Sequence, residues 1–206
     1  MLEKGWITHE QLRRALEAQK NAGTCRIGQW LIRQGAISED QVTRALGLQW
    51  SCPVLSLEQH DPAAMTAVIP RYFVDAFGAL PIRIAGRRLL YLGFEQALDA
   101  VLALAVERMS GLRVESGIVA GADFHRAQSA MLEQSFPSVE LVEAVSASAA
   151  ARALARSFER ARPAAGRLVR LHDCLWLRMW ENAGQEGASG PGGIRDVVCS
   201  VGTDWR

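Results

Sequence analysis

Residues 5–19 and 35–49 read GWITHEQLRRALEAQ and GAISEDQVTRALGLQ, and this pair of stretches decides the fold of the N-terminal part of the chain. Gly35 follows Gly5 by 30 residues, and the Ile, the Ala-Leu pair and the final Gln recur at the same interval. A duplicated unit with such close spacing suggests a site built from two equivalent half-sites.

Each copy carries the signal that starts a helix. Thr8 precedes an apolar run and is followed three residues later by Gln11, which is the capping-box arrangement. Ser38 and Gln41 repeat it. The positions that follow are spaced i, i+3, i+4, i+7, so each set shares one helix face. The two sets are Leu12, Ala15, Leu16 and Gln19, and Val42, Ala45, Leu46 and Gln49.

A shorter helix is predicted ahead of the second copy. Ile27, Trp30 and Leu31 are spaced to share one face of it. Gly35 suits the left-handed residue that ends such a helix. The unit is therefore helix, Gly turn, helix.

The order Arg-Ile-Gly, Leu, Gly, Ile, Val, Ala-Leu, Gln over residues 26–49 resembles the repeated signature of the MshEN or GspE N-terminal domain family. These domains stand at the N-terminus of type II secretion and type IV pilus assembly ATPases, and some bind cyclic di-GMP, one guanine nucleotide half per repeat. The resemblance implies a receptor for this second messenger. The ligand-binding residues that it implies are Leu12, Leu16, Gln19, Arg26, Ile27, Gly28, Leu31, Gly35, Val42, Leu46 and Gln49.

The first copy departs from the family signature. Met1 falls on the position of Leu31, so the counterpart of Arg26-Ile27-Gly28 is missing and one complete half-site is expected. Either the true start lies upstream of Met1, or ligand binding has decayed. The competing interpretation is a packed scaffold, because apolar residues at helical spacing are more often core than ligand contacts. An exposed Arg26 is then a solvated side chain, although a guanidinium suits guanine edges and phosphates.

Composition limits the class of protein. The chain has 206 residues, 49% of them hydrophobic and 22% charged, as in an ordinary soluble globular protein of one or two domains. A net charge of +1 gives no field that attracts DNA, RNA or an acidic membrane surface. No apolar stretch approaches ~18 residues and no leader is present, so we expect a cytoplasmic protein without membrane insertion.

The sequence contains no constellation typical of catalysis or metal binding. Cys25, Cys52, Cys174 and Cys199 are scattered, which favours reduced thiols and no zinc. His172-Asp173-Cys174 lacks the partners of a nucleophilic site. No Gly-x-x-x-x-Gly-Lys-[Ser/Thr] occurs, so the ATPase motor is absent. We predict a non-enzyme without a cofactor, and cyclic di-GMP is the small ligand that the resemblance implies.

The middle of the chain is predicted to be a small α/β unit. Asp61-Pro62 and Pro70 each start a short helix. The remaining elements are expected in the order strand, strand, helix, strand, helix, where Asp99, Glu107 and Asp123 are solvated helix residues or an N-cap. Their ranges are 79–84, 89–94, 96–109, 112–118 and 123–133.

The last third of the chain predicts a helix and a β-hairpin. Ser146 caps a helix that runs to Arg160, and residues 166–171 and 174–180 form the hairpin. Both faces of the second strand are bulky, so it is expected to be central or covered, with Trp176 and Trp180 in a core. A Gly-rich loop over 183–193 is the candidate for disorder, and a strand follows at 194–201.

The fold class expected from these patterns is α+β. Three segments are expected: a helical repeat (1–57), an α/β subdomain (58–136) and a C-terminal αβ extension (137–206). Two functions stay open, a cyclic di-GMP receptor and a ligand-independent adaptor for protein docking. In both, we expect a protein partner, either a secretion or pilus component or a signalling protein.

Overall fold

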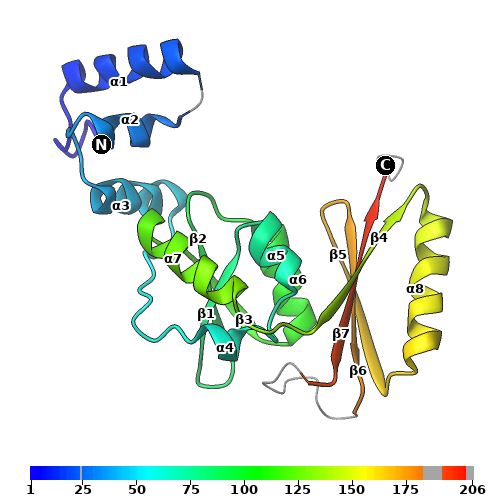
Figure 1. Ribbon diagram of the computed structural model, residues 1–206. Coiled ribbons are helices and arrows are strands. Elements are labelled where there is room, and N and C mark those ends of the chain that lie inside the picture. Colours follow the sequence, from blue (N-terminus) through cyan, green and yellow to red (C-terminus); the bar gives the residue numbers. More distant parts are fainter. Residues whose placement is uncertain (24, 183–191, 203–206) are drawn as a thin grey trace.

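The computed structural model describes residues 1–23, 25–182 and 192–202. Three helices come first: α1 (His9–Ala22), α2 (Ile27–Arg33) and α3 (Glu39–Trp50). Helices α1 and α2 pack on each other and project from the rest of the molecule, whereas α3 lies against it and contacts β3 (Figure 1). The helix, Gly turn, helix order predicted from the sequence is confirmed.

The middle unit has the predicted order of elements. Its members are α4 (Pro62–Met65), α5 (Arg71–Ala76), β1 (Leu80–Ala85), β2 (Leu89–Phe94), α6 (Ala100–Ser110), β3 (Arg113–Ile118) and α7 (Gly121–Leu132). Strand β2 is central, antiparallel to β1 and parallel to β3. Val54 adds one parallel bridge to Ile118, so the segment after α3 is attached to the edge of this sheet.

Two predicted helix starts were wrong. Helix α6 begins at Ala100 and not at residue 96, because the Asp99 carboxylate accepts a hydrogen bond from the Leu102 N–H and acts as the N-cap. Helix α7 begins at Gly121, two residues before the predicted start at Asp123. The sequence left Asp99 and Asp123 open as helix residues or an N-cap; Asp99 is the cap of α6, whereas Asp123 lies inside the first turn of α7.

The C-terminal part forms a four-stranded sheet with one helix. Its elements are β4 (Ser138–Ala144), α8 (Ala147–Ala161), β5 (Ala165–Leu171), β6 (Cys174–Trp180) and β7 (Ile194–Val201). The strand order is β4-β7-β6-β5, with β4 parallel to β7 and the other neighbours antiparallel. The sequence did not predict β4. Most of the loop expected to be disordered, residues 183–191, lies outside the described residues.

The two faces of this sheet are covered by different parts of the chain. Helix α8 covers one face, where Leu154 packs with Leu177 and Val197. The other face carries Trp176 and Trp180, which belong to the same core cluster as the middle unit. Both tryptophans are buried and β6 is an inner strand, as predicted. The domain boundary expected near residue 136 stays a prediction.

A buried ion pair lies within the C-terminal sheet, and its arginine also donates hydrogen bonds to the middle unit. Arg178 on β6 donates to both carboxylate oxygens of Asp196 on β7, each at 2.8 Å. Its remaining donor reaches the carbonyls of Ala67 and Val68, and the indole N–H of Trp176 donates to Asp196 at 2.8 Å. Fully paired in this way, the two charges avoid the penalty of an unsatisfied buried group. Among the described residues, no helix is both long and apolar enough to cross a membrane.

Candidate functional site

The two copies of the repeat begin with the same local geometry. Thr8 and Ser38 are N-caps whose hydroxyls accept from the N–H groups of Gln11 and Gln41, and each Gln side chain accepts from the cap N–H in return. Both predicted capping boxes are confirmed. The glycines that precede them, at residues 5 and 35, have φ of +65° and +64°, which favours glycine.

The projecting helices α1 and α2 pack around a small hydrophobic core that is separate from the core of the middle unit. Its buried members are Ile7 and Ile37 from the two turns, Ala15 from α1 and Leu31 from α2. Leu31 is only 1% exposed, so this predicted ligand-binding residue is a core residue in the described chain. Gly35 lies in the turn after α2 and also shapes the scaffold.

The second copy brings its remaining predicted residues to the crossing of α2 and α3. Arg26 is the exposed N-cap of α2 and Ile27 is half-buried beside it. A β-carbon at Gly28 would lie 3.2 Å from Cγ1 of Val42, so glycine permits α2 to cross α3 closely here. Gly28 thus allows the start of α2 to lie close to Val42 on α3.

Along α3, the face that begins at Val42 continues to Leu46 and Gln49. Leu46 is half-buried and Gln49 is exposed. With a rise of 1.5 Å per residue, this face runs about 10 Å along the helix from Val42 to Gln49. An apolar side chain and an amide are therefore available along this face of α3, and the Arg26 guanidinium is exposed at the start of α2.

The equivalent residues of the first copy are placed differently. Leu12 is half-buried in the small core, whereas Leu16 on the next turn is 49% exposed. Gln19 donates its amide to the Cys25 carbonyl at 2.9 Å and so holds the connection between α1 and α2. The two halves of the predicted site are not equivalent in this structure.

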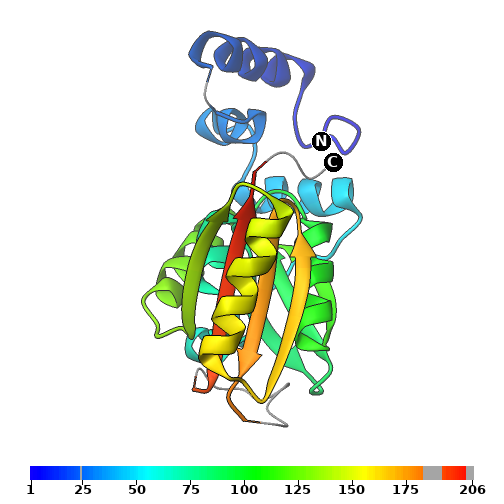
Figure 2. The same ribbon diagram turned by 90° about the vertical axis from the view of Figure 1, so that its right-hand side faces the viewer.

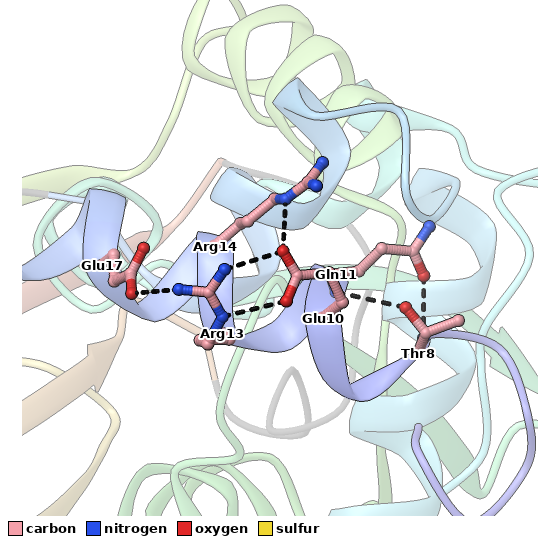
Figure 3. A network of polar contacts seen from close by, with 6 residues as sticks. All are labelled: Thr8, Glu10, Gln11, Arg13, Arg14 and Glu17. Atoms are coloured by element: carbon pink, nitrogen blue, oxygen red, sulfur yellow. Dashed lines mark hydrogen bonds and ion pairs between the residues drawn. The ribbon is translucent and has the colours of Figure 1, made fainter.

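A network of exposed ion pairs lies on the outer side of α1. Arg13 donates to both oxygens of Glu10 and to Glu17 at 2.6 Å, and Arg14 also donates to Glu10 (Figure 3). Hydrogen bonds from Arg13 and Arg14 lower the pKa of Glu10 to about 2. Surface pairs of this kind support a helix weakly and provide no group suited to catalysis.

Two contacts that the sequence did not predict fix α3 to the middle unit. Oε1 of Glu39, in the first turn of α3, accepts from the Ala122 N–H at 2.7 Å. Helix α7 has Ala120 at its N-cap position without a side-chain cap, so Glu39 supplies the negative charge that a helix start favours. At the other end of α3, the Trp50 indole donates to the Gln96 carbonyl at 3.1 Å. No local signal reveals either contact, since the partners are far apart in sequence.

The His172-Asp173-Cys174 segment does not assemble a nucleophile. His172 and Asp173 form the turn between β5 and β6, and His172 contacts Asp99 through Nε2 at 2.7 Å and stacks on Phe77. Burial is the main reason that the pKa of the Cys174 thiol rises to about 11. The group is therefore a neutral thiol near pH 7. Among the described residues, no cluster of His, Cys, Asp and Glu is arranged to hold a metal ion.

A hollow of ≈ 610 Å³ lies on the opposite side of α3 from the Val42 face. Trp6, Leu48 and Val54 give it an apolar lining, and Arg44 stands at its side. Leu48 is 61% exposed. The predicted site residues do not line this hollow.

Comparison with known proteins bears on up to about two thirds of the chain. A solved structure of MshE with cyclic di-GMP matches with a TM-score of 0.50 and 28% identity, over 63% of this chain and 94% of that one. Type IV pilus assembly ATPase PilB from Myxococcus xanthus is 31% identical over 91 residues, and bacteriophage adsorption protein B from Escherichia coli K12 is 31% identical over 120 residues.

These matches cover 44% and 58% of this chain, which spans 16% of the length of each curated relative. No family model matches the sequence.

Proposed function

We propose that this chain, which is similar to the MshEN or GspE N-terminal domain family over about two thirds of its length, is a non-catalytic receptor for cyclic di-GMP. The observation that carries the proposal is the open surface of the second copy. Arg26, Leu46 and Gln49 are left partly or fully exposed there, beside the close crossing of Gly28 and Val42.

Each of these side chains has a chemical role in the proposal. The Arg26 guanidinium presents a planar set of donors that fits the acceptor edge of guanine or a phosphate. Ile27, Val42 and Leu46 supply apolar contacts for the base, and the Gln49 amide can both donate and accept. Gly28 and Leu31 act indirectly, by setting how closely α2 and α3 approach.

The first copy contributes the second half of the proposed surface. Leu12 and Leu16 offer apolar contact, with Leu16 the more exposed of the two. Gln19 must exchange its hydrogen bond to Cys25 for one to the ligand. This exchange makes the first half-site the weaker one.

Binding is transmitted by α3 in the proposal, and no chemical step is involved. The same helix carries the Val42 face and the two contacts made by Glu39 and Trp50 with the middle unit. A ligand that changes the tilt of α3 therefore changes how the middle unit is presented to a protein partner. The expected partner is a secretion or pilus component, or a signalling protein.

Calorimetric titration of the full chain with cyclic di-GMP tests the proposal, with GMP and cyclic di-AMP as controls for selectivity. Replacing Arg26 by Ala removes a charge-assisted contact, so we expect the affinity to fall about ten- to a hundredfold, or ~1 to 3 kcal/mol. The matched control is Arg44→Ala, because Arg44 lies on the opposite side of α3. Equal affinities of the Arg26→Ala protein and the wild type would overturn the assignment.

The hollow beside Leu48 favours a second candidate function, that of an adaptor independent of nucleotide. Its apolar lining and exposed Leu48 suit docking of a protein surface, and the resemblance implies an inner-membrane platform protein as partner. The test is titration with the cytoplasmic part of such a protein, without nucleotide. We expect Leu48→Asp to abolish binding and Leu16→Asp, which is on α1, to leave it unchanged.

A further inference from the structure

The C-terminal sheet has an incompletely covered outer face. Helix α8 packs mainly on β4, β7 and β6, and β5 lies beside it at the edge of the sheet (Figure 2). A helix about 10 Å across covers roughly two strands spaced about 4.8 Å apart, so one helix does not cover four. Leu168 on β5 is accordingly 53% exposed, and Phe158 on the neighbouring side of α8 is 40% exposed.

The exposed Phe158 ring is held in place by the sheet. A β-carbon at Gly166 on β5 would lie 2.5 Å from Cε2 of Phe158, so the ring rests directly on the strand backbone. A ring fixed by backbone contact loses little freedom when a partner covers it. Phe158 is therefore an ordered apolar side chain at the surface.

The side chains around Phe158 on α8 are small or charged. At 100° per residue, Ala151, Ala155 and Phe158 lie within about 60° of one another around the helix. Arg152 and Glu159 lie together just beyond Ala155, on the side away from the sheet. Within the described parts of the chain, neither of these two charges has an ion-pair partner.

We propose that this face of α8 binds a second copy of the chain, with the two α8 helices antiparallel across a two-fold axis near Ala155. The sequence position midway between Ala151 and Phe158 lies within one residue of Ala155. The same is true of the position midway between Arg152 and Glu159. The axis therefore sets Ala151 against Phe158 of the second copy, and Arg152 against Glu159 of the second copy. A two-fold axis makes each contact twice.

Charge and size both select this arrangement. In the antiparallel pair, Arg152 of each copy lies on the same side of the interface as Glu159 of the other copy, so unlike charges are opposed. The alanines allow the helix axes to approach to about 8 Å. Phe158 then fills the space above Ala151 of the second copy and shields Leu168 from water. The self-complementary pattern argues for a second copy and not for an unrelated acidic or basic helix.

Sedimentation velocity of the full chain over a wide concentration range tests the proposal. We expect a monomer–dimer equilibrium. The single variants Arg152→Glu and Glu159→Arg each place like charges opposite one another twice, so we expect each to raise the dissociation constant about tenfold. The double variant restores unlike pairs and should return the constant to near the wild-type value. Arg88→Glu, an equal charge change in an exposed turn far along the chain, is the matched control and should have no effect.

Circular dichroism of each variant verifies that the fold is kept, and all three changes are at exposed positions. A monomer at every concentration would overturn the proposal. So would a dimer that neither single charge reversal weakens, or one that the double variant fails to restore. Because these measurements contain no nucleotide, their outcome is separate from that of the cyclic di-GMP titration.

Discussion

In the first copy of the repeat, Ala15 is fully buried and Gln19 is bonded to the Cys25 carbonyl, whereas in the second copy Ala45 is half-buried and Gln49 is exposed. The two copies nevertheless begin alike, with the same capping box and the same turn. Helix α1 packs on α2, and α3 packs on the middle unit. A duplicated sequence therefore fixes how each helix starts, while its surroundings decide which of its residues remain free.

The largest effect is expected in the two turns that precede α1 and α3, and it tests whether these turns are equivalent. Ile7 and Ile37 are both 5% exposed in the same small core. Replacing either one by Ala removes buried volume, so we expect each variant to lose about 2 to 5 kcal/mol of unfolding free energy in the repeat. Hydrogen exchange of the α1 and α2 amides and urea unfolding measure this loss. Losses that differ by more than about 1 kcal/mol would show that the turns are not equivalent.

A smaller effect is expected where α3 meets the chain that follows it. A β-carbon at Gly47 would lie 3.1 Å from the Cys52 carbonyl oxygen and 3.3 Å from the Val54 side chain. Gly47→Val therefore overpacks this contact, and we expect a loss of about 1 to 3 kcal/mol in urea unfolding. Glu17 is the equivalent residue of α1, but it is exposed. Glu17→Val should therefore change stability by less than about 0.5 kcal/mol. Similar losses in both variants would contradict the difference between the copies.

The two glutamines provide a sharper test, with opposite results for stability and binding. Gln19→Ala removes the bond to Cys25, so we expect a loss of about 1 kcal/mol of stability in the α1–α2 unit. Gln49→Ala changes an exposed side chain and should leave stability unchanged. Calorimetry should show that Gln49→Ala lowers the affinity for cyclic di-GMP more than Gln19→Ala does. The reverse order of affinities would argue that the first copy carries the stronger half-site.

The smallest effect is expected from pH. The folded-state pKa of Glu10 is about 2, below its usual value of 4.5, because Arg13 and Arg14 donate to its carboxylate. This support for α1 is therefore fully present above pH 4.5 and is lost as the pH falls from 4.5 to about 2. Asp40, at the equivalent position of α3, makes no ion pair within the described residues.

Amide exchange at decreasing pH, after correction for the intrinsic rates, should show α1 losing protection before α3. The Glu10→Gln protein is the control and should show less of this difference. Loss of protection in both helices at the same pH would mean that the network contributes nothing specific to α1.

Much of the fold was accessible from the sequence because its signals are local. The capping boxes, the order of elements in the middle unit and the hairpin with its buried tryptophans follow from residue spacing and caps. Strand β4 was missed because it is an edge strand whose residues are mostly exposed, and its alternation is weak. The start of α6 was misplaced because spacing alone did not decide whether Asp99 lies inside the helix or caps it.

The sequence by itself determined where the helices of the repeat begin and which residues share a face, since hydrogen bonds within four residues and the 3.6-residue period fix both. Only the tertiary structure decided that Leu31 is core while Gln49 is exposed, that Glu39 caps α7, and that Arg178 is neutralised by Asp196. Each of these depends on segments distant in sequence, so burial and pairing there are properties of the packed chain and not of any local pattern.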